Sequence, residues 1–220
     1  MNSIPNTLNF SLATMLRLIG SLSFLWLLMA ISTAAQTPAV LDTTGRPLRS
    51  GVRYYVLPAA TDIAGGLTLI NRTDSCPLYV GQEPLSTVVS PGLPVIFTPF
   101  SAGDGIIREG RDLRIEFSAV SICAQSTAWR VGEEDAKTSR RFIVTGGEQS
   151  YFRIDNNRGL YELVWCPGES CPDCGRPRCG SAGILIENGK RFLALDGRAF
   201  PFRFRRAYRR HRLSLLSLFS

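Results

Sequence analysis

Residues 40–48 read VLDTTGRPL and residues 54–56 read YYV, and this stretch says more about the fold than any other part of the chain. An aliphatic residue, an aspartate, a glycine, a second aliphatic residue and a tyrosine occur there at set spacings: Val40, Asp42, Gly45, Leu48 and Tyr54. Downstream, short apolar or alternating runs recur between turn-forming residues, and helical periodicity is hard to find. The chain is therefore expected to be all-β.

Twelve segments have the composition or alternation typical of strands. They are Val52–Leu57, Leu67–Ile70, Leu78–Val80, Val95–Thr98, Leu113–Phe117, Trp129–Val131, Phe142–Thr145, Tyr151–Ile154, Tyr161–Trp165, Ile184–Glu187, Phe192–Leu195 and Phe202–Phe204. Asn188-Gly189 predicts a two-residue hairpin turn, because both central positions of that turn need positive φ. Twelve short, closely spaced strands favour a sandwich or a closed barrel. No linker divides residues 36–204, so we expect one domain there.

Composition excludes several classes of function. The chain has 220 residues, of which 45% are apolar and 20% charged, as in globular proteins. Its one histidine, His211, lies close to the C-terminus. A nucleophile paired with histidine, an HExxH motif and a multi-histidine metal centre are thereby excluded. We expect no catalytic residues, no metal and no cofactor, and hence not an enzyme.

The N-terminus has the pattern of a secretory signal peptide. Arg17 precedes an apolar run of 14 residues, 18–31, and the small residues 32–35 follow it. The run is short for a bilayer span, although a membrane anchor is the alternative. We expect residues 1–35 to be removed, leaving a mature chain of about 185 residues.

In a secreted chain the cysteines are expected to form disulfides. All six lie in the expected mature chain: Cys76, Cys123, Cys166, Cys171, Cys174 and Cys179. An even number in an oxidising compartment predicts three disulfides. The C-x4-C-x2-C-x4-C cluster at 166–179 could instead bind zinc, but the absence of a nearby histidine disfavours this alternative. Asn71-Arg72-Thr73 is a glycosylation sequon, so we expect a glycan on Asn71.

The basic charge is concentrated near the C-terminus. The formal net charge is +7, and residues 205–212 contain five arginines with no acidic residue after Asp196. A nucleic-acid-binding face would need basic residues and stacking aromatics on the body, so no nucleic-acid partner is expected. We take residues 205–220 as a solvated tail, with polyanion binding as the alternative. The final LSLLSLFS is too short to cross a membrane, and no membrane contact is expected after signal cleavage.

The stretch at 40–56 resembles the signature of the plant Kunitz (soybean trypsin inhibitor) family. Further blocks agree in the same order: Cys76-Pro77-Leu78, residues 110–117, Thr127-Ala128-Trp129, residues 151–154 and residues 161–167. The resemblance covers about residues 38–205, and the nested cysteine cluster is similar to that of the miraculin-like branch.

This resemblance implies a β-trefoil of twelve strands in three pseudo-repeats, with bridges Cys76–Cys123, Cys166–Cys179 and Cys171–Cys174. It also implies a secreted inhibitor of a serine or cysteine protease, extracellular or alternatively vacuolar. The cysteine that links miraculin chains is absent before Tyr151, so a monomer is expected.

Family inhibitors present an exposed, substrate-like loop, which falls here between the fourth and fifth predicted strands. Its residues are Pro99, Phe100, Ser101, Ala102, Gly103, Asp104 and Gly105. The primary specificity position falls on Ser101 or Gly103, depending on the end from which it is counted. The loop-supporting asparagine of the family corresponds to Ser50. Because the loop has no Lys or Arg, we expect weak inhibition of trypsin, and a non-inhibitory defence, storage or binding protein is the alternative function.

Overall fold

The computed structural model describes residues 37–60, 63–73, 76–123, 126–175 and 177–208. The predicted signal peptide, His211 and most of the predicted tail lie outside these residues. The described strands are β1 (Arg53–Pro58), β2 (Leu67–Ile70), β3 (Tyr79–Gln82), β4 (Val95–Pro99), β5 (Leu113–Phe117), β6 (Trp129–Glu134), β7 (Arg141–Thr145), β8 (Arg153–Asn157), β9 (Leu160–Trp165), β10 (Gly180–Ser181), β11 (Gly183–Glu187), β12 (Lys190–Ala194) and β13 (Phe202–Arg206).

All twelve predicted strands are present within a few residues of their expected bounds. The two-residue strand β10 was not predicted. Asn188 and Gly189 have φ of 50° and 74° and join β11 to β12, which confirms the predicted hairpin turn. β13 continues to Arg206, and the N–H of Ala207 still bonds the carbonyl of Arg53 at 2.9 Å. The domain therefore extends past the expected boundary at residue 204.

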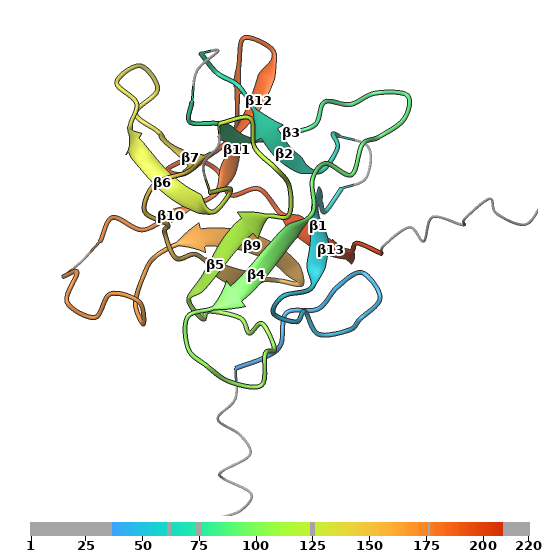
Figure 1. Ribbon diagram of the computed structural model, residues 1–220, viewed down its shortest axis with the longest axis vertical. Coiled ribbons are helices and arrows are strands. Elements are labelled where there is room, and N and C mark those ends of the chain that lie inside the picture. Colours follow the sequence, from blue (N-terminus) through green and yellow to red (C-terminus); the bar gives the residue numbers. More distant parts are fainter. Residues whose placement is uncertain (1–36, 61–62, 74–75, 124–125, 176, 209–220) are drawn as a thin grey trace, which may run out of the picture. The chain divides into compact units, whose positions relative to one another are not determined.

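Six strands form a closed ring in the order β1-β4-β5-β8-β9-β13 (Figure 1). The junction between β5 and β8 is an isolated bridge, in which Leu113 and Phe152 exchange two N–H···O hydrogen bonds of 2.8 Å. Alternate residues of these strands face inward, and the packed interior includes Tyr54, Phe97 and Phe204. Trp129 of β6 is also fully buried in this core.

The other long strands form three hairpins, β2–β3, β6–β7 and β11–β12, which pair with one another through β3, β7 and β12. Together they form a cap that occupies the upper half of Figure 1. Tyr79, Phe142 and Phe192 occupy equivalent positions in the three pairings. Their rings meet edge to face with centroids 5.6 to 5.7 Å apart. This ring-and-cap arrangement with threefold repetition is the β-trefoil expected from the resemblance.

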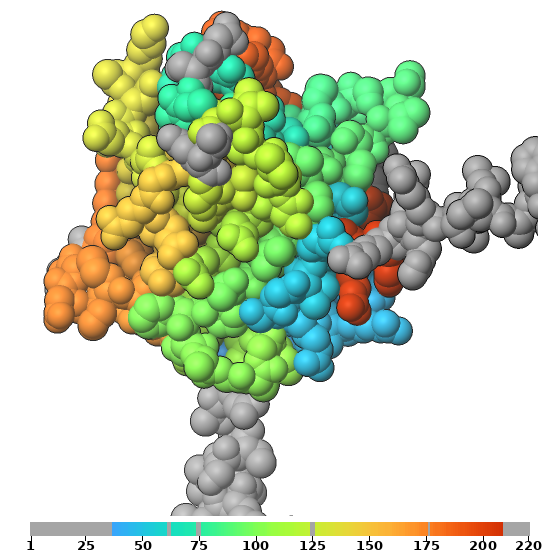
Figure 2. All heavy atoms as spheres, in the orientation of Figure 1, coloured from blue at the N-terminus to red at the C-terminus, as the bar shows by residue number. Residues whose placement is uncertain are grey.

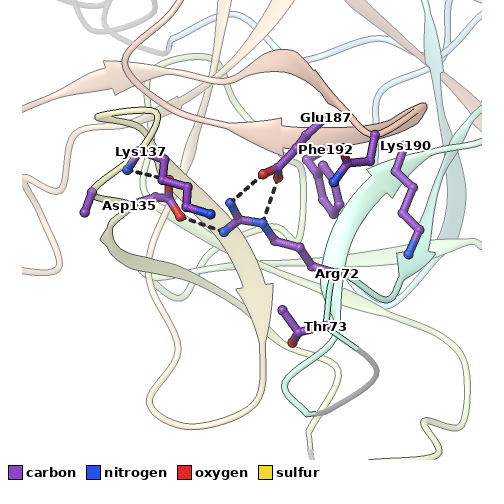
Figure 3. A pocket seen from close by; sticks show the side chains of 9 residues that line it. Arg72, Thr73, Asp135, Lys137, Glu187, Lys190 and Phe192 are labelled. Atoms are coloured by element: carbon purple, nitrogen blue, oxygen red, sulfur yellow. Dashed lines mark hydrogen bonds and ion pairs between the residues drawn. The ribbon is translucent and has the colours of Figure 1, made fainter.

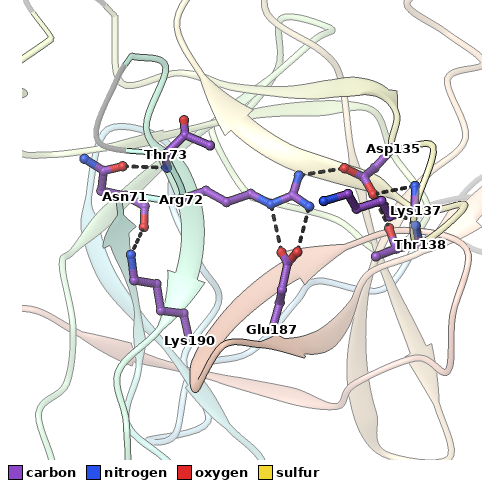
Figure 4. A network of polar contacts seen from close by, with 8 residues as sticks. All are labelled: Asn71, Arg72, Thr73, Asp135, Lys137, Thr138, Glu187 and Lys190. Atoms are coloured by element: carbon purple, nitrogen blue, oxygen red, sulfur yellow. Dashed lines mark hydrogen bonds and ion pairs between the residues drawn. The ribbon is translucent and has the colours of Figure 1, made fainter.

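Arg72 lies over two rings of this aromatic triad, those of Phe142 and Tyr79, and Figure 4 shows it held between two carboxylates. Its guanidinium carbon is 4.2 Å from the ring centroid of Phe142. The guanidinium bonds Glu187 through two nitrogens at 2.8 and 3.1 Å and Asp135 at 2.8 Å. The hydrogen bond from Arg72 lowers the pKa of Asp135 to about 2. One side chain from each hairpin region thus joins the three hairpins electrostatically.

The six cysteines form three disulfides, Cys76–Cys123, Cys166–Cys179 and Cys171–Cys174, as the resemblance implied. The first joins positions 47 residues apart and the last joins positions 3 apart. A zinc site at 166–179 is therefore wrong, since all four of its sulfurs are paired.

The two extreme bridges should differ in their contribution to stability. In the chain-entropy model the long loop is worth about 4 kcal/mol and the short ring about 2 kcal/mol. We expect the pair Cys76→Ala/Cys123→Ala to lower the free energy of unfolding by about 2 kcal/mol more than Cys171→Ala/Cys174→Ala. Urea unfolding of both variants measures this, and a larger loss for the second pair would contradict it.

Candidate functional site

The connection between β4 and β5 carries the residues predicted to bind a protease, and in Figure 1 it is the green loop below these strands. Residues 101–104 are exposed, and Phe100 is 44% exposed, with its ring edge-on to Tyr151 at 5.1 Å. Pro99 ends β4, and Gly105 is half-buried. The structure thus brings the predicted residues together as one exposed tip with no basic side chain.

The C-terminal limb of this loop pairs with the VLDTTGRPL stretch. The Ser50 N–H donates to Gly105 O at 2.8 Å, and the Ile107 N–H donates to Leu48 O at 2.9 Å. Val40 completes the pairing through its N–H to Ile107 O at 2.9 Å. Ser50 therefore contacts the loop through its main chain, and its hydroxyl has no hydrogen-bond partner among the described residues.

Asp42 and Gly45 shape the turn that positions this supporting segment. One carboxylate oxygen of Asp42 accepts the Thr44 N–H at 2.8 Å and the Thr44 hydroxyl at 2.6 Å, and Gly45 has φ of 76°. Burial alone would raise the pKa of Asp42, but the bonds from Thr44 and Arg46 lower it. The aspartate and the glycine of the opening pattern are thus explained by one turn.

The N-terminal limb of the loop is attached to the main chain of Asp112, a residue that is 1% exposed. The main-chain carbonyl of Asp112 accepts the Phe100 N–H at 2.8 Å. Its carboxylate accepts hydrogen bonds from Arg153 Nε at 2.6 Å, Gly168 N at 2.9 Å, and Ser170 N and Oγ at 2.8 and 2.7 Å. Burial alone would raise the pKa of Asp112, but these donors outweigh it and lower the pKa to about 2.

Glu169 adds a second contact between the loop and the segment closed by the Cys166–Cys179 bridge. It accepts the Ser101 hydroxyl at 3.0 Å and pairs with Arg111 at 2.6 Å. Sequence reasoning missed Asp112, Glu169 and Ser170 as supports. The only available indication was an aspartate directly before an apolar strand, which does not identify its partners.

Asp104 stiffens the loop tip between its two glycines. One carboxylate oxygen accepts the Ile106 N–H at 3.0 Å, and the other pairs with Arg108 at 2.7 Å. The bond from Ile106, with Arg108 beside it, lowers the pKa of Asp104. Arg108 and Arg111, the basic residues next to the tip, are each paired with a carboxylate.

A separate pocket of about 440 Å³ lies beside Arg72 in the cap (Figure 3). It is lined by Arg72, Thr73, Asp135, Ala136, Lys137, Glu187, Asn188, Lys190 and Phe192. Its guanidinium and both carboxylates pair with one another, and Lys190 Nζ donates to the Asn71 carbonyl at 2.6 Å. We therefore assign no ligand to this pocket. The described residues contain no group of three or more His, Cys, Asp or Glu arranged to hold a metal ion.

Comparison with known proteins agrees with this geometry. A family model described as trypsin and protease inhibitor, the legume Kunitz type, matches residues 40–206. The chain belongs to the plant Kunitz family of protease inhibitors. Its members are inhibitors rather than enzymes, and disulfide-rich Kunitz inhibitors of plants are typically secreted.

Relatives include Kunitz type trypsin inhibitor 104 of Medicago truncatula, 44% identical, with 84% of this chain and 94% of the relative covered. Miraculin of Synsepalum dulcificum is 35% identical, with 80% of this chain and 86% of miraculin covered. The chain shares the cysteine pattern of the miraculin-like branch, but its sequence is less similar to miraculin than to the Medicago inhibitor. The solved structure of the bifunctional alpha-amylase/subtilisin inhibitor of Oryza sativa is 35% identical, with a TM-score of 0.65 and 78% of this chain and 100% of that chain covered.

The low pKa of Asp112 predicts a pH-dependent contribution to the stability of this Kunitz domain. The pKa of Asp112 is about 2 in the folded protein, and the ordinary value is 3.8. The ionised carboxylate therefore stabilises the folded state fully above pH 3.8. This stabilisation, about 2 kcal/mol, is lost as the pH falls towards 2. We expect Asp112→Asn to lower the free energy of unfolding at pH 7 by at least this amount, and to have much less effect near pH 2. Urea unfolding across this pH range measures the effect.

Asp173→Asn is the matched control. Asp173 is exposed and lies in the segment closed by the Cys166–Cys179 bridge, which also contains Gly168 and Ser170, the partners of Asp112. An equal loss in both variants, or a loss for Asp112→Asn that does not change with pH, would contradict the assigned role of Asp112.

Proposed function

We propose that the chain inhibits a serine endopeptidase by presenting residues 99–105 as a substrate-like segment, and that it inhibits trypsin poorly. The supporting observation is an exposed tip attached on both limbs, to Asp112 and Glu169 on one side and to Ser50 on the other. A loop held in this way loses little further entropy when a protease binds it. The family includes inhibitors of serine proteases and of cysteine proteases, such as the potato protein whose structure is 26% identical.

The side chains of the tip favour a protease with a shallow, uncharged specificity pocket. Ser101, Ala102 and Gly103 are small and exposed, whereas trypsin needs a cationic side chain to pair with the acid in its pocket. The relative from Oryza sativa named as an alpha-amylase/subtilisin inhibitor is 41% identical over 171 residues, with 72% of this chain and 84% of that protein covered. We therefore expect stronger inhibition of subtilisin than of trypsin by the unmodified protein.

Introducing arginine at the tip should convert the protein into a trypsin inhibitor. Gly103 has no heavy atom within 4 Å of the position of an added Cβ, so Gly103→Arg fits without displacement. Ala102→Arg is equally exposed, whereas Ser101→Arg loses the bond to Glu169 and places the guanidinium beside that carboxylate. We expect Gly103→Arg or Ala102→Arg to lower the trypsin inhibition constant by about 100-fold or more, and Ser101→Arg to have a smaller effect. Ser50→Asn in the better variant should strengthen inhibition further by adding a side-chain bond to the loop.

Val120→Arg is the control, since it adds the same charge at a site that is 99% exposed on another loop. If no tip variant gains trypsin affinity over this control, and the wild type inhibits neither subtilisin nor elastase, the non-inhibitory alternative replaces the proposal. Nanomolar inhibition of trypsin by the wild type would show that the specificity residue lies outside residues 101–103.

A further inference from the structure

The connection between β3 and β4, residues 83–94, carries a second run of exposed residues. Residues 84–89 read PLSTVV, and all six are exposed. Leu85 is 58%, Val88 81% and Val89 46% exposed, and no charged residue occurs in this connection after Glu83. The green residues of this segment protrude at the upper right of Figure 2. Clustered apolar side chains in solvent mark interaction sites, whereas singly scattered ones are ordinary.

The base of this connection is closed by main-chain hydrogen bonds from both of its limbs to Gly65-Gly66. The Gly65 N–H donates to Glu83 O and the Glu83 N–H donates to Gly66 O, both at 2.9 Å. On the other limb, the Gly66 N–H donates to Ser90 O at 3.0 Å. A Cβ added to Gly66 would overlap the carbonyl oxygen of Pro91, so the limb packs where only glycine fits. The connection is therefore fixed at its base, and residues 84–89 form its tip.

The main chain of this tip is available to a partner. Among the described residues, no main-chain N–H of residues 84–89 donates a hydrogen bond. The Ser86 hydroxyl donates to Val88 O at 2.5 Å, across the bend at Thr87 and Val88. A segment with unpaired main-chain groups can pair with the strands that line a protease cleft, while a pocket in the cleft selects one of its side chains.

The tip at 84–89 and the loop at 99–105 leave opposite ends of β4 (Val95–Pro99), as Figure 1 shows. A strand of this length spans about 17 Å, at about 3.4 Å per residue. One loop lies below the barrel in that view and the other extends from the cap side, so they do not form one continuous surface. A partner of the tip at 84–89 therefore has a binding site of its own.

We propose that residues 84–89 form a second protease-binding loop, with Leu85 as the specificity residue for a serine protease whose pocket is deep and apolar, such as chymotrypsin. Pro84 restricts the main chain before Leu85, which lowers the entropy lost on binding. Leu85 is unbranched at Cβ, unlike Val88, and reaches further into an apolar pocket. The chain belongs to a family of protease inhibitors, so a protease is the partner that fits this tip. Because the residues differ from those at 99–105, this site and the proposed function can fail separately.

The test is the inhibition of chymotrypsin and of trypsin by the wild type and by variants at Leu85. We expect the wild type to inhibit chymotrypsin. Leu85→Ser should raise the chymotrypsin inhibition constant at least about 30-fold, as truncation of a central interface side chain does. Leu85→Arg should lose chymotrypsin inhibition to the same extent and gain inhibition of trypsin, whose pocket pairs with a cation. A merely structural role for Leu85 would not exchange one specificity for the other.

Val120→Ser is the matched control, because it truncates an exposed aliphatic side chain on the β5–β6 connection and should change the inhibition constant less than about twofold. Thermal melts of every variant confirm that it is folded.

Three outcomes would overturn the proposal. The first is a wild type that does not inhibit chymotrypsin, or that is cut after Leu85 without lasting inhibition. The second is inhibition that Phe100→Ser abolishes and Leu85→Ser leaves intact, which would assign it to the loop at 99–105. The third is a dimer that Leu85→Ser dissociates while chymotrypsin is not inhibited, which would replace the protease by a second copy of this chain.

Discussion

The barrel can close only if β5 and β8 meet, and they do so through two main-chain hydrogen bonds between Leu113 and Phe152. Asp112 precedes Leu113 and Arg153 follows Phe152, and these two residues form an ion pair of 2.6 Å in which the Asp112 carboxylate is buried. The closing bridge of the barrel therefore lies beside Asp112, whose main-chain carbonyl holds the N-terminal limb of the loop at 99–105. Distortion of this junction would open the barrel and release one limb of the loop together, because the same few residues serve both purposes.

The strands could be read from sequence because alternation and turn residues are local properties. β10 was missed because Gly180-Ser181 has no strand character, and it pairs with Trp165 next to the Cys166–Cys179 bridge. Charge at a chain end is typical of solvated residues and predicts a tail at Arg205 and Arg206, whereas β13 pairs both with β1. The sequence predicts an exposed connection between β4 and β5, but it does not predict what supports that connection, since Asp112 and Ser170 are 58 residues apart and no local pattern joins them.

Rigidity in the loop is distributed unevenly, and this bears on how an inhibitor of this kind recognises a protease. Both limbs are fixed by hydrogen bonds to different parts of the chain, while Gly103 has neither a side chain nor a close neighbour. The freedom of the backbone is thus confined to a few residues at the tip. Substitutions at these exposed residues should leave the barrel unaffected, so the specificity proposed for them could change without loss of the fold.

The position of Arg72 has a consequence for the symmetry of the molecule. Tyr79, Phe142 and Phe192 can repeat three times because each occupies its own third of the cap, but the one guanidinium of Arg72 lies over the rings of Phe142 and Tyr79 and takes a carboxylate from each of the other two hairpins. A sequence with three identical repeats would bring three guanidinium groups together there, with no carboxylate to receive them. The first repeat must therefore differ from the second and third, which supply Asp135 and Glu187. A threefold backbone whose three hairpins are joined by one cation requires unlike repeats, and an attempt to make this chain internally identical would have to begin by replacing Arg72.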